Sequence, residues 1–337
     1  MAAAGGAAAC LGAACAWLPS SPPLEPVALT RLREGSPPPP GDNWPLGPER
    51  IEALLQSGHA EIVSLEPLST GVTRPYKALV RFPDEELTLP FKWKPSTPDL
   101  DHWNNSPRKE LAAYAIQKWF LDPEDYVVPT VELVCVPLEG YRKHVPDATP
   151  TVPGTSCVLG LFAIWLEGVG TPDTLYDADR FRTDPTYATH LGRLNLLMYL
   201  IGHRDGRGAN VLASDDDANR RVFSVDNGIA FDPPLFNWFY SHWDRIRVPA
   251  LPERAVRRLA DLDDDRIESL EVVAELHADD SGVLRPVLPG EAWDDDLAVD
   301  VRPGALQLGL TEREAEALED RVEWLTERAE DGDLALF

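Results

Sequence analysis

Apolar, β-favouring residues concentrate in three consecutive runs near the start of the globular part of this chain. The runs are EIVSLEPL (61–68), PYKALVRF (75–82) and LTLPFKWK (87–94), and short polar or glycine-containing turns separate them. Runs of this length, rich in β-branched and aromatic residues and bounded by turn-forming residues, are typical of strands. The pattern predicts a three-stranded antiparallel meander.

A helical pattern follows the third run. Ser106 is a favoured N-cap residue, and Pro107 suits the first helical position, where a missing N–H costs little. Apolar residues then recur at helical spacing through RKELAAYAIQKWFL (108–121), which predicts one buried face. Two later apolar runs, VVPTVELVCVPL (127–138) and TSCVLGLFAIWLEGV (155–169), predict two further strands.

The second half of the chain has mainly helical patterns around one short hairpin. Residues 174–201 are helical in pattern with an interruption at Pro185, whereas VLAS (211–214) and RVFSV (221–225) predict two short strands around a polar turn. An amphipathic helix is predicted after Thr311, which has a Glu three positions later and so matches a capping box.

The N-terminal region differs in composition from the rest. Residues 1–18 are apolar but dominated by Ala and Gly, without the basic segment of a signal peptide, and they are too short to span a bilayer as a helix. Residues 19–48 are rich in proline and predict an extended linker. We therefore expect a cytoplasmic protein. Export or membrane anchoring through residues 1–18 is the alternative, and any membrane association would run through that segment.

Charge and cysteine content exclude several classes of function. The formal net charge is −25, from 56 acidic against 31 basic residues, which argues against nucleic acid and against anionic lipid as main partners. The four cysteines have no metal-ligand spacing and are too few for a disulfide scaffold. Cys135 and Cys157 lie in apolar runs that look like neighbouring strands, so we expect buried core thiols, with a cross-strand disulfide as the alternative.

Candidate chemistry concentrates between Tyr199 and Asp232. The tripeptide His203-Arg204-Asp205 is followed five residues later by Asn210, which is the spacing of the protein-kinase loop H-R-D-x-x-x-x-N. In that loop the Asp accepts the proton of the attacking hydroxyl and the Asn binds a divalent cation. Arg207 stands where such loops often carry a cation that lies against the transferring phosphate.

The hairpin brings a second carboxylate toward this loop. If Val211 pairs with Val225 and Leu212 with Ser224, then Asn210 faces Asp226 across the mouth of the hairpin. Two oxygen ligands at such a separation can hold Mg²⁺ and leave coordination positions for water and phosphate. Asn210 and Asp226 are therefore the predicted metal ligands.

The segment that begins at Asp226 indicates a more specific resemblance than the protein-kinase loop alone. Asp226-Asn227-Gly228, within VDNGIAF, replaces the D-F-G of ordinary protein kinases. It closely resembles the D-N-G segment of the phosphatidylinositol 3/4-kinase-like enzymes and of the Golgi secretory-pathway kinases. The resemblance implies an α+β, bilobal protein-kinase-like fold with an antiparallel-sheet small lobe and a mainly helical large lobe. It also implies ATP and Mg²⁺ or Mn²⁺ as cofactors.

The lysines near the third strand fit the same resemblance. Lys92 and Lys94 lie on one face of that strand because side chains alternate with period two. Trp93-Lys94-Pro95 resembles the family's aromatic-Lys-Pro triplet, so Lys94 is the first choice for the phosphates and Lys92 the fallback. Arg108 to Tyr114 resembles the R-x-E-x-A-A-Y segment, which makes Glu110 the carboxylate that pairs with the lysine.

Two backbone regions complete the predicted nucleotide site. The loop containing Gly71 could cover phosphates, although it is not G-x-G-x-x-G, and a simple hairpin turn is the alternative. The end of the apolar strand, around Glu167, is the predicted hinge that contacts adenine. The resulting division is residues 1–47 as a disordered Ala-rich and Pro-rich region, 48–167 as the small lobe and 168–337 as the large lobe.

The sequence thus favours an ATP-dependent kinase that phosphorylates an unknown hydroxyl acceptor, a protein or a small polar molecule. A phosphatidylinositol 3/4-kinase and a nucleotide-binding pseudokinase are the alternatives. Fold alone does not choose among acceptors.

Overall fold

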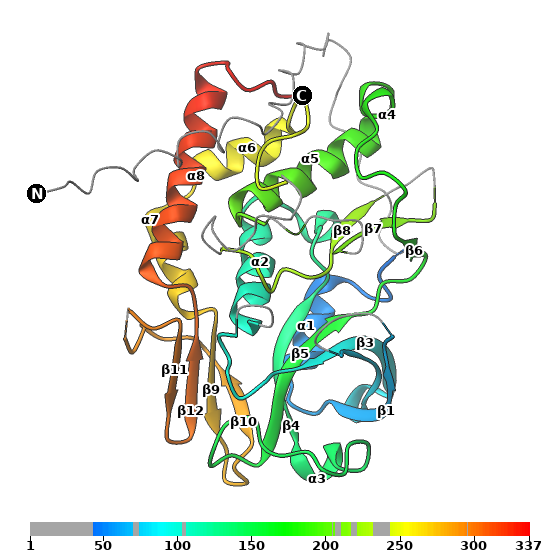
Figure 1. Ribbon diagram of the computed structural model, residues 1–337, viewed down its shortest axis with the longest axis vertical. Helices are drawn as coiled ribbons and strands as arrows, with labels where there is room; N and C mark the ends of the chain where they lie inside the picture. Colours follow the sequence, from blue (N-terminus) through cyan, green and yellow to red (C-terminus); the bar gives the residue numbers. More distant parts are fainter. Residues whose placement is uncertain are drawn as a thin grey trace, which may run out of the picture.

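The structure is a computed structural model of the 337-residue chain. It describes residues 43–69, 74–102, 106–203, 205, 210–216, 221–231, 243–294 and 296–337. The small lobe, the large lobe and a C-terminal sheet are distinguishable in Figure 1. The α+β class and the bilobal kinase-like architecture expected from the sequence are confirmed.

The small lobe is built on a five-stranded antiparallel sheet with the strand order β1-β2-β3-β5-β4. Its strands are β1 (Glu61–Pro67), β2 (Tyr76–Phe82), β3 (Leu87–Pro95), β4 (Val131–Pro137) and β5 (Cys157–Ile164). The predicted meander and the two later strands are all present. Strand β5 is buried along almost its whole length, as expected for a strand inside a sheet.

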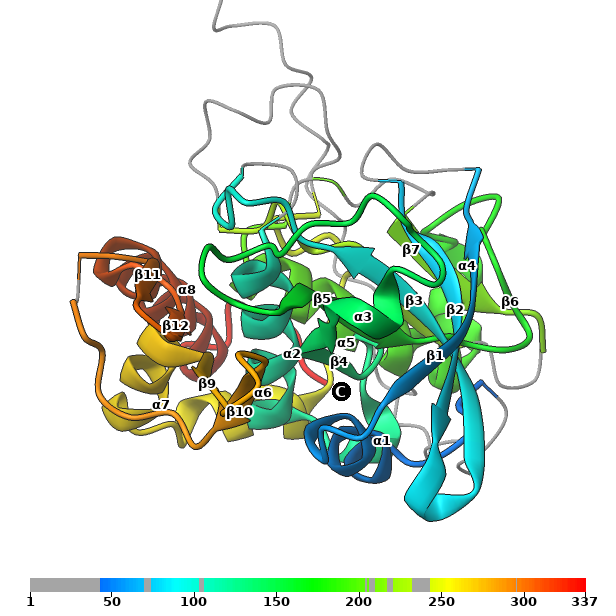
Figure 2. The same cartoon turned by 90° about the horizontal axis from the view of Figure 1, so that it is seen from below.

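Helix α2 (Pro107–Phe120) follows β3 and stands beside the small-lobe sheet, with the C-terminal sheet on its other side (Figures 1 and 2). Ser106 occupies the predicted N-cap position, but its hydroxyl donates to the Asp101 carboxylate at 3.3 Å rather than capping the helix. Arg108 in the first turn is almost fully buried. Its guanidinium pairs with Glu314 at 2.6 and 3.1 Å and with Asp101 at 2.6 Å.

A short N-terminal segment precedes the sheet. Helix α1 (Pro48–Gln56) begins at a proline, and the chain turns at Gly58, whose φ of +75° favours glycine. The ordered packing starts earlier than this helix. Asn43 and Trp44 are both buried, and the Trp44 ring meets the Phe223 ring edge-on with centroids 6.0 Å apart. These two residues therefore belong to the packed structure.

The large lobe contains the helices and the predicted hairpin. Its helices and strands are β6 (Val169–Gly170), α4 (Ala178–Thr183), α5 (Pro185–Leu200), β7 (Val211–Ser214), β8 (Val222–Ser224), α6 (Glu253–Ala260), α7 (Asp264–Glu268) and α8 (Glu312–Glu330). Strands β6, β7 and β8 form a three-stranded sheet. Pro185 begins α5, as the sequence pattern indicated, and Thr311 and Glu314 form the predicted capping box of α8.

A four-stranded C-terminal sheet was not anticipated from the sequence. It has the order β10-β9-β12-β11, from β9 (Ala274–Ala278), β10 (Leu284–Val287), β11 (Val299–Arg302) and β12 (Ala305–Leu308). Its strands are short, and the glycine turn at Gly304 was the available hairpin signal. The sheet reaches the small lobe, where the Ser156 N–H donates to the Gly282 carbonyl at 2.7 Å.

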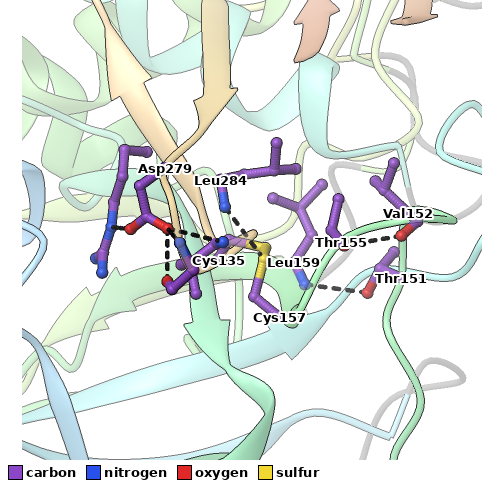
Figure 3. The surroundings of a disulfide bond; sticks show 11 residues. Cys135, Thr151, Val152, Thr155, Cys157, Leu159, Asp279 and Leu284 are labelled. Carbon is purple, nitrogen blue, oxygen red and sulfur yellow. Dashed lines mark hydrogen bonds and ion pairs between the residues drawn. A yellow bond between two sulfur atoms is a disulfide. The ribbon is translucent and has the colours of Figure 1, made fainter. Parts of the chain in front are cut away.

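Cys135 and Cys157 form a disulfide between β4 and β5, with Cα atoms 5.4 Å apart (Figure 3). The two residues lie diagonally across the ladder, because Cys135 is opposite Leu159. The alternative of a cross-strand disulfide is thus the one observed, in place of the expected free thiols. The Leu284 N–H approaches the Cys157 sulfur at 3.4 Å, which brings β10 to the same place. The short helix α3 (Leu138–Tyr141) follows β4.

Within the described part of the chain, no helix combines the length and apolar character needed to cross a membrane.

Candidate active site

Strand β3 points two lysines to one face and a tryptophan to the other, as the period-two pattern predicted. Trp93 is fully buried against Phe162, with ring centroids 4.4 Å apart, and its indole N–H donates to the Tyr141 hydroxyl at 3.2 Å. Lys92 and Lys94 therefore share the opposite face, toward the large lobe. Lys94 is the buried one of the two, with an exposed fraction of 4%.

Lys94 lies between two carboxylates. Its Nζ is 3.3 Å from Glu110 Oε1 on α2 and 3.3 Å from Asp226 Oδ1 after β8. Burial by itself would lower the pKa of Lys94, but the negative charges of Asp226 and Glu110 outweigh burial and raise it. Lys94 therefore carries a fixed positive charge. It is the lysine that the sequence favoured for contacting the phosphates. The predicted Lys94–Glu110 pair is present.

The two carboxylates respond to this environment in opposite directions. Burial raises the pKa of Glu110 above its ordinary value, against the opposing charge of Lys94. Burial also acts to raise the pKa of Asp226, yet the charges of Lys94 and Lys92 hold it well below the usual range. The Asp226 side chain is 41% exposed, so one of its faces stays accessible for a further cation.

Glycine at position 228 keeps this group of charges accessible. A Cβ added to Gly228 would lie 3.2 Å from Lys94 Nζ, 3.6 Å from Glu110 Oε1 and 3.7 Å from Asp226 Oδ1. The first of these distances is tighter than most van der Waals contacts. The absent side chain therefore leaves space beside the ammonium group.

Asp205 and Asn210 form the second part of the site. Both are buried, and Asn210 Nδ2 donates to Asp205 Oδ2 at 2.7 Å and to the Asp205 carbonyl at 3.1 Å. Two acceptors on this side require the NH₂ group there, so the Asn210 amide oxygen faces the opposite way. Asn210 thus orients the Asp205 carboxylate and presents an oxygen of its own.

His203 connects the two parts. The Asp205 N–H donates to His203 Nδ1 at 3.1 Å, so Nδ1 is the acceptor and the proton resides on Nε2. Nε2 then donates to the Asp226 carbonyl at 3.0 Å. Burial lowers the pKa of His203 to about 4, which keeps the ring neutral and this tautomer intact. His203 belongs to the predicted motif, but no pattern in the sequence indicated this connection.

The predicted register of the hairpin is wrong by one residue. Val211 lies opposite Ser224, not Val225, and the Val225 N–H donates to the Asn210 carbonyl at 3.0 Å. Asn210 therefore faces Val225 instead of Asp226. The residues of β7 and β8 are buried on both faces, so no alternation of apolar and polar positions was available to specify the register.

The available donors fit a divalent cation bound together with phosphate. No group of three or more His, Cys, Asp or Glu able to hold a metal occurs among the residues that the structure describes. An amide oxygen from Asn210 and the partly open Asp226 carboxylate are hard oxygen donors of the kind that Mg²⁺ prefers, and such sites usually take further ligands from water and substrate phosphates. The assignment of these two residues as ligands remains a prediction.

Other predicted residues have different outcomes. Gly71 and Arg207 lie outside the described residues. Lys92 Nζ donates to the Val225 carbonyl at 3.2 Å and so joins the two lobes directly. The Glu167 N–H donates to the Asn43 carbonyl at 3.0 Å, and the Glu167 carbonyl accepts from Asn43 Nδ2 at 2.8 Å. Both backbone groups of Glu167 are therefore already hydrogen-bonded within the protein.

Sequence reasoning missed the partners of Asn227. The side chain is fully buried, its Oδ1 accepts from the Ser224 hydroxyl at 2.6 Å, and its backbone N–H donates to Glu110 Oε2 at 2.9 Å. The only signal in the sequence was the replacement of Phe by Asn in the D-x-G segment. That replacement indicates a polar environment without naming the partners.

An α+β kinase-like fold in which a Lys–Glu–Asp group is linked through His203 to an Asp–Asn pair is the arrangement defined by these observations. No family model matches the chain, and no curated protein matches it in sequence.

Three solved structures are similar in fold. Hydra Fam20 with sugar matches with a TM-score of 0.46 and 14% identity, over 85% of this chain and 91% of that one. The Golgi casein kinase with Mn/ADP bound has a TM-score of 0.49 and 12% identity, over 83% and 75% of the chains. The Golgi casein kinase in a second structure has a TM-score of 0.49 and 13% identity, over 83% and 74%.

Two expectations are corrected at this point. The three neighbours correspond to the Golgi-kinase part of the sequence resemblance, and none of them is a phosphatidylinositol kinase, so that part of the resemblance is unsupported. The expected cytoplasmic location is wrong. The disulfide between Cys135 and Cys157 is a bond that cytosolic reductants keep rare.

Proposed function

We propose that this chain is an ATP-dependent phosphotransferase that transfers the γ-phosphate to a hydroxyl group of a protein or a small polar molecule. The observation that carries the proposal is the position of buried Lys94 between Glu110 and Asp226, with Asp226 linked through His203 to the Asp205–Asn210 pair. Phosphoryl transfer depends mainly on positioning and on electrostatic stabilisation, and this group supplies both.

Lys94 binds the phosphates that link the nucleoside to the transferred group. Its charge is fixed by two carboxylates, and charge-assisted hydrogen bonds to phosphate oxygens are among the strong ones. Glu110 keeps the ammonium in place through its second contact, to the Asn227 N–H. A divalent cation held by Asn210 and Asp226 would neutralise charge on the phosphates; one neighbouring structure contains Mn/ADP, and this chain would take Mg²⁺ or Mn²⁺.

Asp205 acts on the acceptor. The hydroxyl oxygen of the acceptor forms a bond to the γ-phosphorus, the bond from that phosphorus to the β–γ bridging oxygen breaks, and ADP leaves. The hydroxyl proton passes to the Asp205 carboxylate. Asn210 holds that carboxylate in one orientation by donating a hydrogen bond to Oδ2. His203 Nδ1 accepts a hydrogen bond from the Asp205 backbone N–H. Asp205 is therefore the proposed base or orienting group.

The acceptor class can be tested with one experiment. The purified full-length chain is incubated with radiolabelled ATP, Mn²⁺ or Mg²⁺, and separate pools of protein, sugar and phosphoinositide acceptors. We expect label in the protein or sugar pool, and none with Asp226→Ala. Label in the phosphoinositide pool would instead establish a lipid kinase. Nucleotide binding without label in any pool would establish a pseudokinase.

A further inference from the structure

Asn43 lies in front of the first helix of the small lobe, yet it contacts the predicted hinge. Its carbonyl accepts from the Glu167 N–H at 3.0 Å. Its side-chain Nδ2 donates to the Glu167 carbonyl at 2.8 Å and to the Gly168 carbonyl at 3.2 Å. Two consecutive residues of the link between the lobes are thus held by one residue 124 positions before the first of them in the chain.

The same amide reaches the strand that leads away from Asn210. Asn43 Nδ2 approaches the Ser214 hydroxyl at the end of β7 at 3.3 Å, and the Gly168 carbonyl also accepts from the Asp215 N–H at 2.7 Å. Asn43 therefore joins the hinge to the hairpin that forms part of the site. Its neighbour Trp44 is buried against Phe223 on β8, which fixes the position of the segment.

The burial of Asn43 makes its hydrogen bonds costly to lose. Asn43 is 2% exposed, and hydrogen bonds at buried sites are costly to lose because the abandoned groups stay desolvated. The Asn43 Oδ1 atom is itself buried and has no hydrogen-bond partner among the described residues. The amide orientation is nevertheless determined, because three oxygen acceptors surround the nitrogen and require the NH₂ group there.

Some backbone polar groups of the hinge are hydrogen-bonded within the described structure, and others are not. Both backbone polar groups of Glu167 are engaged by Asn43. No described residue hydrogen-bonds the N–H or the carbonyl of the preceding residue, Leu166, which is itself buried. Leu166 is thus a hinge residue whose N–H and carbonyl are both left for a ligand edge.

We infer that Asn43 is a positioning residue for nucleotide binding, which fixes the hinge peptides so that the backbone of Leu166 reads the purine edge. The inference rests on the proposed phosphotransferase function. It extends the nucleotide-binding apparatus to a residue outside the expected small lobe, in the segment that enters it.

The test compares two substitutions of Asn43. A hydrogen-bonding role and a space-filling role predict opposite orders for their effects on nucleotide affinity. Asn43→Ala removes the amide, and we expect the Kd for ADP in the presence of Mn²⁺, measured by calorimetry on the full chain, to rise about tenfold, as loss of roughly 1.4 kcal/mol would cause. Asn43→Asp keeps the shape but places a carboxylate among three oxygen acceptors. We expect a larger increase in Kd than with Ala.

A residue that merely fills space would give the reverse order, with the isosteric Asp milder than Ala, and that order would overturn the inference. Values within about twofold of the wild type for both variants would overturn it as well. In either case the proposed function stands if the wild-type chain binds ADP. Absence of nucleotide binding by the wild type itself would instead remove the proposed function.

A milder variant keeps the test decisive if the Asn43 variants do not fold. Ser214→Ala removes one acceptor of the amide and leaves the hinge contacts in place. We expect the Kd for ADP to rise about threefold, consistent with one net hydrogen bond of roughly 0.5–1 kcal/mol. An unchanged Kd in Ser214→Ala would contradict the link between the hairpin and the hinge through Asn43.

Discussion

Glu110 Oε2 accepts a hydrogen bond from the backbone N–H of Asn227 at 2.9 Å, while Glu110 Oε1 faces Lys94. One carboxylate on α2 therefore holds both the lysine and the segment that carries Asp226. In ordinary protein kinases the residue at position 227 is the Phe of D-F-G, whose packing distinguishes active from inactive states. Here a buried polar residue, hydrogen-bonded to Ser224, takes that place.

Replacement of Glu110 by Gln should weaken the site. Gln can still accept from the Asn227 N–H, but it cannot balance the charge of Lys94, so the lysine is drawn toward Asp226 alone. We expect turnover to fall by about tenfold or more, since hydrogen bonds to charged groups contribute about 1.5–3 kcal/mol. Steady-state kinetics measures the effect. Glu312→Gln, on the exposed first turn of α8, is the control and should match the wild type.

Replacement of Asp205 by Asn should separate binding from chemistry. The change removes the charge and the proton acceptor and keeps the size, so nucleotide affinity should change little. Turnover should fall by at least ~10²-fold, the lower end of what general acid–base groups contribute. Calorimetry with ADP and a transfer assay with a verified acceptor give the two quantities. Near-normal turnover would show that Asp205 only caps the local structure.

The buried His190 predicts a loss of stability in acid. Burial, with Arg193 and Arg221 nearby, lowers the pKa of His190 to about 3, below its ordinary value of 6.5. The folded state thus binds fewer protons than the unfolded state between these values, so this contribution is complete above about pH 6.5 and is lost as the pH falls. The slope is about 1.4 kcal/mol per pH unit.

Urea unfolding at pH 7.5, 6.0 and 5.0 measures this slope. In His190→Gln the pH dependence should be shallower than in the wild type by about that amount per unit. Equal slopes in the wild type and His190→Gln would mean that His190 is not buried as a neutral ring.

The disulfide predicts a large effect of reduction. Cys135 and Cys157 are separated by 22 positions, and closing a loop of this size stabilises a chain by about 3 kcal/mol. The double variant Cys135→Ser/Cys157→Ser should lose about that much unfolding free energy. Alkylation without prior reduction should leave both thiols unlabelled. Labelling of Cys135 in the unreduced, denatured protein would contradict the bond.

Local features of the site could be predicted from the sequence because they depend on short-range geometry. The alternation of side chains along β3 placed Lys92 and Lys94 on one face, and a proline at the start of α2 located Glu110 one turn in. Period-two reasoning failed for the hairpin. Its strands are buried on both faces, and one register fits that pattern as well as the next.

Contacts between distant segments could not be predicted, since no local pattern encodes them. Nothing around Asn43 indicates that it binds a hinge 124 residues later. The C-terminal sheet was missed for a related reason. Its strands of four or five residues are too short for periodicity to distinguish them from loops, and pairing among them supplies what the sequence pattern lacks.

The ion pair between Arg108 and Glu314 has a consequence for biosynthesis. The two residues are 206 positions apart, and Glu314 lies in the first turn of the last helix. A ribosome therefore releases Glu314 only after 206 further residues have been added beyond Arg108. Until then the guanidinium has the Asp101 carboxylate but lacks its two hydrogen bonds to Glu314, and an incompletely paired charge disfavours the packed state. The helix that presents Glu110 thus completes its ion pairs only once Glu314 has been synthesised.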